Sequence, residues 1–157
     1  MSVTLTLPRP LQEAGLFSRV DLEFRAVDHS GPSYEGRVFL DNPSADSSTP
    51  AEESEGYAGS FYVFGHGGCF GELSHCDVRE QPAGVYDRRP PHQLTPQFKT
   101  VTVTEAVRRL LETSQGESFQ ITVVAVVYEQ SEGGGDPLKF ESVSLFVFED
   151  PVAAGHG

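Results

Sequence analysis

Hydrophobic and polar residues alternate most clearly between positions 20 and 26. Val20, Leu22, Phe24 and Ala26 form one set, and Asp21, Glu23 and Arg25 form the other. Successive side chains of a β-strand point to opposite faces, so this alternation predicts a half-buried strand whose charged face meets water.

Four further segments are rich in aromatic and β-branched residues and also predict strands. They are residues 34–40, 57–64, 119–128 and 138–148. The segment 119–128 is apolar on both faces towards its end, which is typical of a central strand. The glycine-rich stretch 131–137 then predicts a flexible hairpin loop before the last strand.

One helix is predicted over about residues 103–113. Val103, Val107, Leu110 and Leu111 recur at helical spacing. Thr102 and Glu105 have the spacing of a capping box, in which a hydroxyl and a carboxylate each bond a free amide at the helix start. Gly116 is a plausible stop.

The fold class that follows is mainly β: an antiparallel sandwich or barrel of six to seven strands with one short helix. The length of 157 residues suits a single domain spanning 1–157. Residues 41–56 contain five acids and no basic residue, so we expect a mobile surface loop. We expect residues 79–97 to form a proline-rich loop and the tail 151–157 to fray.

Acidic residues outnumber basic ones by 23 to 11, which gives a formal net charge of −12. This balance disfavours nucleic acid and anionic membranes as partners, because both are recognised by clustered Lys and Arg. It indicates a self-repelling soluble surface, or else attraction to a basic partner face. No apolar run approaches the roughly 20 residues of a membrane helix, and the N-terminus has no signal-peptide pattern. We therefore expect an intracellular, cytoplasmic protein with reduced cysteines.

Candidate chemistry is concentrated in residues 57–78, which contain both cysteines and two of the five histidines. The four soft donors are His66, Cys69, His75 and Cys76. Two imidazoles and two thiolates suffice for tetrahedral zinc or for copper(I). Alternatively these residues are purely structural, or the cysteines form a disulfide or a reactive thiol. Their spacing matches no common zinc motif.

Motifs of nucleophilic, phosphate-binding and dinucleotide-binding enzymes are absent from the sequence. A thiolate pair of Cys69 with His66 or His75 is the remaining route to catalysis. An enzyme in its own right is therefore the least favoured interpretation.

The segment from Glu55 to Phe61, Glu-Gly-Tyr-Ala-Gly-Ser-Phe, resembles the C-terminal domain of plant-type polyphenol oxidases and related tyrosinases. It follows an acidic insert and precedes a histidine, His66, as in that family. Other segments stand in similar order: 19–24 for a Lys-Phe-Asp-Val strand, 102–111 for a leucine-rich helix, and 118–127 for a valine-rich strand. The resemblance spans roughly residues 19–148, although the family's Cys-x-x-Cys motif and His-rich segment are missing.

The resemblance implies a β-sandwich that covers the entrance of a dicopper domain in a latent oxidase, or that helps to load copper. A dicopper centre in that family takes more histidines than the five of this chain. We therefore expect a non-catalytic accessory domain, acting in trans on a tyrosinase-like dicopper subunit. Phe70 and Tyr86 are the candidates for plugging its substrate pocket. The alternative is a free-standing copper- or zinc-binding protein that uses the four donors above.

Overall fold

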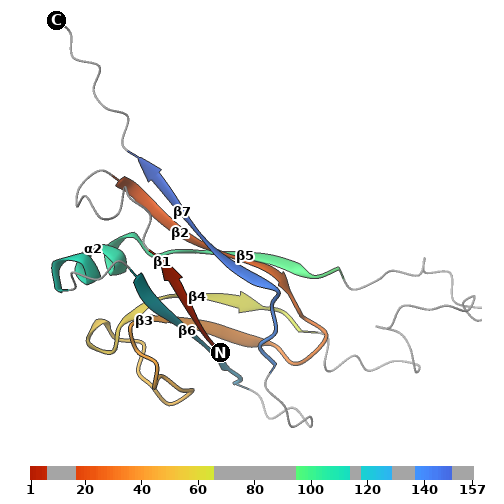
Figure 1. Cartoon of the computed structure of the whole chain (residues 1–157). Helices are drawn as coiled ribbons and strands as arrows, with labels where there is room; N and C mark the ends of the chain where they lie inside the picture. Colours follow the sequence, from red (N-terminus) through yellow and green to blue (C-terminus); the bar gives the residue numbers. More distant parts are fainter. Residues whose placement is uncertain (7–16, 66–94, 114–117, 129–136, 150–157) are drawn as a thin grey trace, which may run out of the picture.

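The computed structural model describes residues 1–6, 17–65, 95–113, 118–128 and 137–149 (Figure 1). Within these ranges the chain forms seven strands, one α-helix and one short 3₁₀ helix. The strands are β1 (Ser2–Thr6), β2 (Phe17–Val27), β3 (Tyr34–Leu40), β4 (Tyr57–Val63), β5 (Gln97–Thr102), β6 (Ser118–Val126) and β7 (Ser142–Glu149). The helices are η1 (Glu53–Glu55) and α2 (Thr104–Thr113).

The strands form two antiparallel sheets. The four-stranded sheet has the order β1-β6-β3-β4, and the three-stranded sheet has the order β5-β2-β7. Their apolar faces meet: Phe24 of the smaller sheet lies 4.9 Å from Phe61 of the larger one, measured between ring centroids. The predicted mainly β, antiparallel sandwich with one short helix is thus confirmed.

The core consists of alternate residues from both sheets, together with residues of α2. Its largest fully buried members inside the sandwich include Phe24, Leu22 and Ile121. Burying such side chains is the main term that stabilises the fold, at about 25 cal/mol for each Å² of apolar surface removed from water.

The alternation in β2 holds only in part. Ala26 has a positive φ of 54°, and the pairing with β5 shifts between Phe24 and Val27. This bulge turns Val27 into the core in place of Ala26. The charged face is not wholly in water either, because Asp21 is only 3% exposed.

The helix prediction is confirmed within one residue, since α2 spans Thr104–Thr113. The capping-box prediction is wrong. Thr102 is the last residue of β5, and its hydroxyl bonds the carboxylate of Asp21. Glu105 instead pairs with Arg108, at 2.5 Å.

Residues 41–56, predicted as a mobile loop, contain the short helix η1 and several hydrogen bonds within the segment. Asp46 accepts hydrogen bonds from the amides of Ser48 and Thr49, at 2.8 and 3.1 Å. The Asn42 amide donates to the carbonyl of Glu55, at 2.8 Å, so the two arms of the segment are joined. Its mobility stays a prediction.

Two strands lie where none was predicted individually: β1 at the N-terminus and β5 at the end of the proline-rich stretch. Of that stretch, residues 79–94 lie outside the described residues, as do the tail 151–157 and the glycine-rich loop up to 136. None of the described helices is long and apolar enough to cross a membrane.

Candidate functional site

The metal-binding and partner-binding residues predicted from the sequence all lie outside the described part of the chain. This applies to the metal donors His66, Cys69, His75 and Cys76, and to the partner-binding candidates Phe70 and Tyr86. Both assignments stay predictions. Among the described residues, no group of three or more histidines, cysteines, aspartates or glutamates is placed to hold a metal ion.

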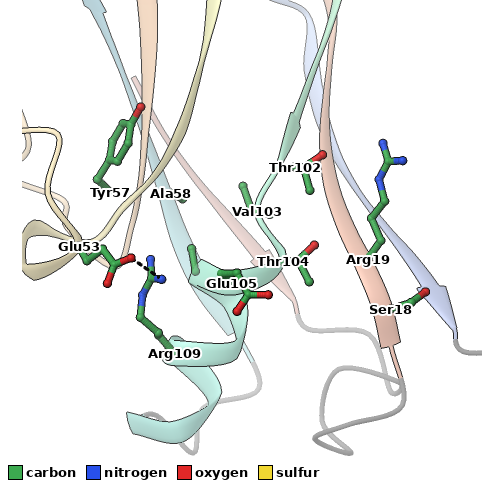
Figure 2. A pocket seen from close by; sticks show the side chains of 11 residues that line it. Ser18, Arg19, Glu53, Tyr57, Ala58, Thr102, Val103, Thr104, Glu105 and Arg109 are labelled. Atoms are coloured by element: carbon green, nitrogen blue, oxygen red, sulfur yellow. Dashed lines mark hydrogen bonds and ion pairs between the residues drawn. The ribbon is translucent and has the colours of Figure 1, made fainter.

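The described residues form an open groove of about 540 Å³ beside the start of α2 (Figure 2). The first residues of β4, directly after η1, form one wall of the groove. The first residues of β2 form the opposite wall. The lining residues are Ser18, Arg19, Glu53, Tyr57, Ala58, Thr102, Val103, Thr104, Glu105, Ala106 and Arg109. The groove therefore lies where both sheets, the helix and the acidic segment meet.

An ion pair between Glu53 of η1 and Arg109 of α2 forms one side of the groove, with 2.9 Å between the charged atoms. The dashed line in Figure 2 marks this pair. A second hollow of about 440 Å³ shares both residues, together with Tyr57 and Ala106. The pair thus joins the acidic segment to the helix between two hollows. Both side chains are solvent-accessible, so the contact contributes at most about 1 kcal/mol to stability.

The opposite side of the groove is formed by Arg19, whose guanidinium lies 2.6 Å from a carboxylate oxygen of Asp21. Burial by itself would raise the pKa of Asp21. Hydrogen bonds from Arg19 and Thr102, together with the positive charge of Arg19, outweigh burial and hold that pKa below its usual value. Asp21 therefore remains charged and fixes both groove residues.

The start of α2 is held against β2 by two hydrogen bonds. The amide of Val20 donates to the Thr104 hydroxyl at 3.0 Å, and the amide of Val103 donates to the carbonyl of Val20 at 2.8 Å. The Thr104 hydroxyl is buried and so serves the strand rather than the groove. These bonds fix the helix relative to the sheet that bears Arg19.

The groove combines two arginines, two glutamates and several hydroxyl groups. Its described lining contains no histidine, cysteine or lysine. Such a surface suits the binding of polar or charged side chains. The sequence pattern did not indicate this groove, although basic residues within so acidic a chain, such as Arg19 and Arg109, were an available signal.

The Gly-Tyr-Ala-Gly-Ser-Phe motif has structural roles in this fold. Gly56 has φ of +77°, ends η1, and accommodates the close approach of the Leu40 carbonyl. Phe61 enters the core between Phe24 and Tyr34. The residues that carry the family resemblance are thus packing residues, and they indicate fold rather than chemistry.

The described part of the chain is an antiparallel β-sandwich with a groove of mixed charge beside its helix. Among solved structures it is similar to recombinantly expressed latent aurone synthase, a polyphenol oxidase, with a TM-score of 0.52 and 16% sequence identity. The same enzyme from its natural source gives a TM-score of 0.51 at 14% identity. Each match covers 96% of this chain and 24% of the other. At this identity the likeness concerns the fold.

No protein-family model matches the sequence. No curated protein matches it either. The chain spans about a quarter of the length of the solved structures that it resembles, 24% in both cases.

Proposed function

We propose that this chain is a non-catalytic accessory domain for a tyrosinase-like dicopper oxidase. The chain binds the separate catalytic subunit and covers its substrate entrance. The observation that carries the proposal is the fold match. Nearly the whole chain, 96%, corresponds to about a quarter of a polyphenol oxidase whose structures are described as latent. Latency means that activity is withheld, and a covering domain is a direct physical means of withholding it.

Two further observations support a non-catalytic role. The described lining of the groove beside α2 combines two arginines, two glutamates and several hydroxyl groups, a composition that suits a binding surface. The whole chain also has only five histidines, too few for the dicopper centre of the family that its sequence resembles. The copper chemistry would therefore belong to the partner subunit.

Phe70 and Tyr86 are proposed to occupy the substrate pocket of that subunit. An aromatic ring resembles a phenolic substrate in shape and would exclude it by occupancy. His66, Cys69, His75 and Cys76 are proposed to assist copper loading, because thiolate and imidazole ligands suit copper(I).

The test is co-purification and inhibition. The chain is mixed with a tyrosinase-like dicopper subunit from the same organism, and diphenol oxidation is followed as the chain is added. We expect a stable complex and a saturable fall in activity. The double variant Phe70→Ala with Tyr86→Ala should bind but inhibit less. Absence of both co-purification and any change in oxidase activity would refute the proposal.

A second candidate function, a metal-binding protein acting alone, rests on the four soft donors between positions 66 and 76. Titration of the folded protein with copper(I) or zinc distinguishes it from the first. Stoichiometric binding that disappears in Cys69→Ala with Cys76→Ala, without any partner subunit, favours this second function. Unchanged affinity in that double variant excludes the site.

A further inference from the structure

A cluster of polar and aromatic side chains lies on the outer face of the four-stranded sheet. Glu35 of β3 pairs across the sheet with Tyr62 of β4 and with Val126 of β6. The next residue along β3, Gly36, pairs with the core residue Phe61, so Glu35 and its neighbours occupy the opposite face. This face is turned away from the second sheet.

Glu35 holds the cluster together. One of its carboxylate oxygens accepts hydrogen bonds from the Arg37 guanidinium, at 2.9 Å, and from the Tyr128 hydroxyl. The other oxygen lies 3.5 Å from the Tyr62 hydroxyl. Burial would raise the pKa of Glu35, but the donors Tyr128, Arg37 and Ser60 lower it overall. Glu35 and Arg37 therefore remain charged and neutralise each other.

The rings of Tyr62 and Tyr128 are exposed to solvent above the Glu35–Arg37 ion pair, whose charges cancel. Tyr62 is 67% and Tyr128 69% exposed, although the hydroxyl groups of both converge on one buried carboxylate. Their orientation is thus fixed before any partner binds, which lowers the entropic cost of binding. Exposed tyrosines beside an arginine have the composition of interface hot spots.

An acidic margin borders the rings. Arg37 also donates to the Thr49 carbonyl, at 3.4 Å, and thereby attaches the segment 41–56 to the same face. Asp46 lies three residues from Thr49 in a hydrogen-bonded turn, and its carboxylate is exposed. The segment carries five acids and no basic residue. The negative charge of Asp46 therefore lies in the turn that Arg37 attaches to this face.

We infer that this surface, formed by Tyr62 and Tyr128 over Glu35 and Arg37 and bordered by residues 41–56, docks a basic segment of a protein partner. Lysine and arginine side chains bind the faces of tyrosine rings by cation–π interaction, and the acidic margin attracts the same cations. A second copy of the chain would bring another net charge of −12 and be repelled. We take the dicopper subunit of the proposed function as the protein that carries this basic segment. The inference rests on the proposed function in that respect alone.

The first test needs no subunit. The peptide acetyl-Arg-Lys-Arg-Lys-amide is titrated into the full chain while NMR follows the ring signals of Tyr62 and Tyr128. We expect saturable shifts of both rings and about a tenfold loss of affinity in Tyr62→Ala with Tyr128→Ala. The matched control is Phe98→Ala, which removes an exposed ring from β5 in the other sheet. Tyr62→Ala alone serves if the double variant fails to fold.

The second test uses the dicopper subunit and the same variants. Loss of binding in the tyrosine variant, with binding kept in the phenylalanine variant, supports the inference. The reverse pattern overturns it while leaving the proposed function intact. If the wild-type chain does not bind the subunit but the ring signals of Tyr62 and Tyr128 shift saturably with the peptide, the proposed function is refuted. The inferred docking surface is then still supported. Peptide shifts that spread over the acidic residues without saturating overturn the surface.

Discussion

The ring of Phe61 lies directly over Gly36 on the neighbouring strand: a β-carbon at position 36 would come within 2.7 Å of the ring carbon Cε1. Because Gly36 has no side chain, Phe61 can contact Phe24 in the opposite sheet, with 4.9 Å between the ring centroids. The contact between Phe61 and Phe24 therefore depends on this one glycine.

Replacing Gly36 with alanine should destabilise the protein by about 1–3 kcal/mol, because the added methyl group overpacks the core and displaces Phe61. Urea unfolding measures the change. Gly31→Ala is the matched control, since among the described residues its β-carbon would approach the β-carbon of Pro137 no closer than 3.9 Å. Equal effects of the two substitutions would contradict the packing described here.

Removing the charge of Arg109 should change the free energy of unfolding by less than about 1 kcal/mol, because its ion pair with Glu53 is solvent-accessible. Arg109→Ala is compared with Arg109→Lys by urea unfolding at low and at high salt. The difference between the variants should shrink as salt screens the charges. A large, salt-independent loss would mean that Arg109 contributes chiefly by packing.

Acid should destabilise the protein partly through Glu35. The folded-state pKa of Glu35 is lowered, so its contribution is complete above the unfolded value of about 4.3 and is lost as pH falls through the folded value. Melting temperatures measured from neutral to acid pH should therefore fall less steeply in Glu35→Gln than in the wild type. Glu52→Gln, at an exposed position, serves as the control. Identical acid slopes for wild type and Glu35→Gln would contradict the prediction.

Neutralising Asp21 should cost about 1–3 kcal/mol, since its buried carboxylate accepts hydrogen bonds from Arg19 and Thr102. Asp21→Asn retains the shape but weakens both bonds. Glu23→Gln, on the same strand, weakens a longer contact of 4.0 Å to Arg25 and should have a smaller effect. Thermal unfolding of the two variants compares them, and a larger loss in Glu23→Gln would refute this account of Asp21.

Native-purified protein should carry about one equivalent of copper or zinc if the donors at positions 66–76 act together, as tetrahedral coordination requires. Elemental analysis after dialysis against a weak chelator measures it. The metal should be lost in Cys69→Ala with Cys76→Ala and kept in His156→Ala. Metal-free wild-type protein would exclude a stable site.

Much of the fold follows from local patterns. The strand β2 and the helix α2 were predicted because apolar residues recur at periods of two and 3.6. The strands β3, β4, β6 and β7 were predicted because their segments are rich in aromatic and β-branched residues. Gln97–Thr102 was not predicted individually, since it follows Pro96 and is held as a strand by pairing with β2. A strand of this kind depends on a partner that is distant in the sequence.

The candidate binding surfaces could not be predicted in this way. The alternating pattern predicts that Asp21 faces solvent, but the sheet register places it between Thr102 and Phe146, where it is buried and pairs with Arg19. Similarly, the Glu35 carboxylate contacts the hydroxyl groups of Tyr62 and Tyr128, which are 27 and 93 residues away in the sequence.

The sequence by itself determined the type of most elements, the antiparallel class and the strong negative charge, because these depend on periodicity and composition. Only the tertiary structure decided which charges are buried, where the groove lies and which aromatic rings stay exposed. These properties depend on strand order and register, through which residues distant in the chain come into contact.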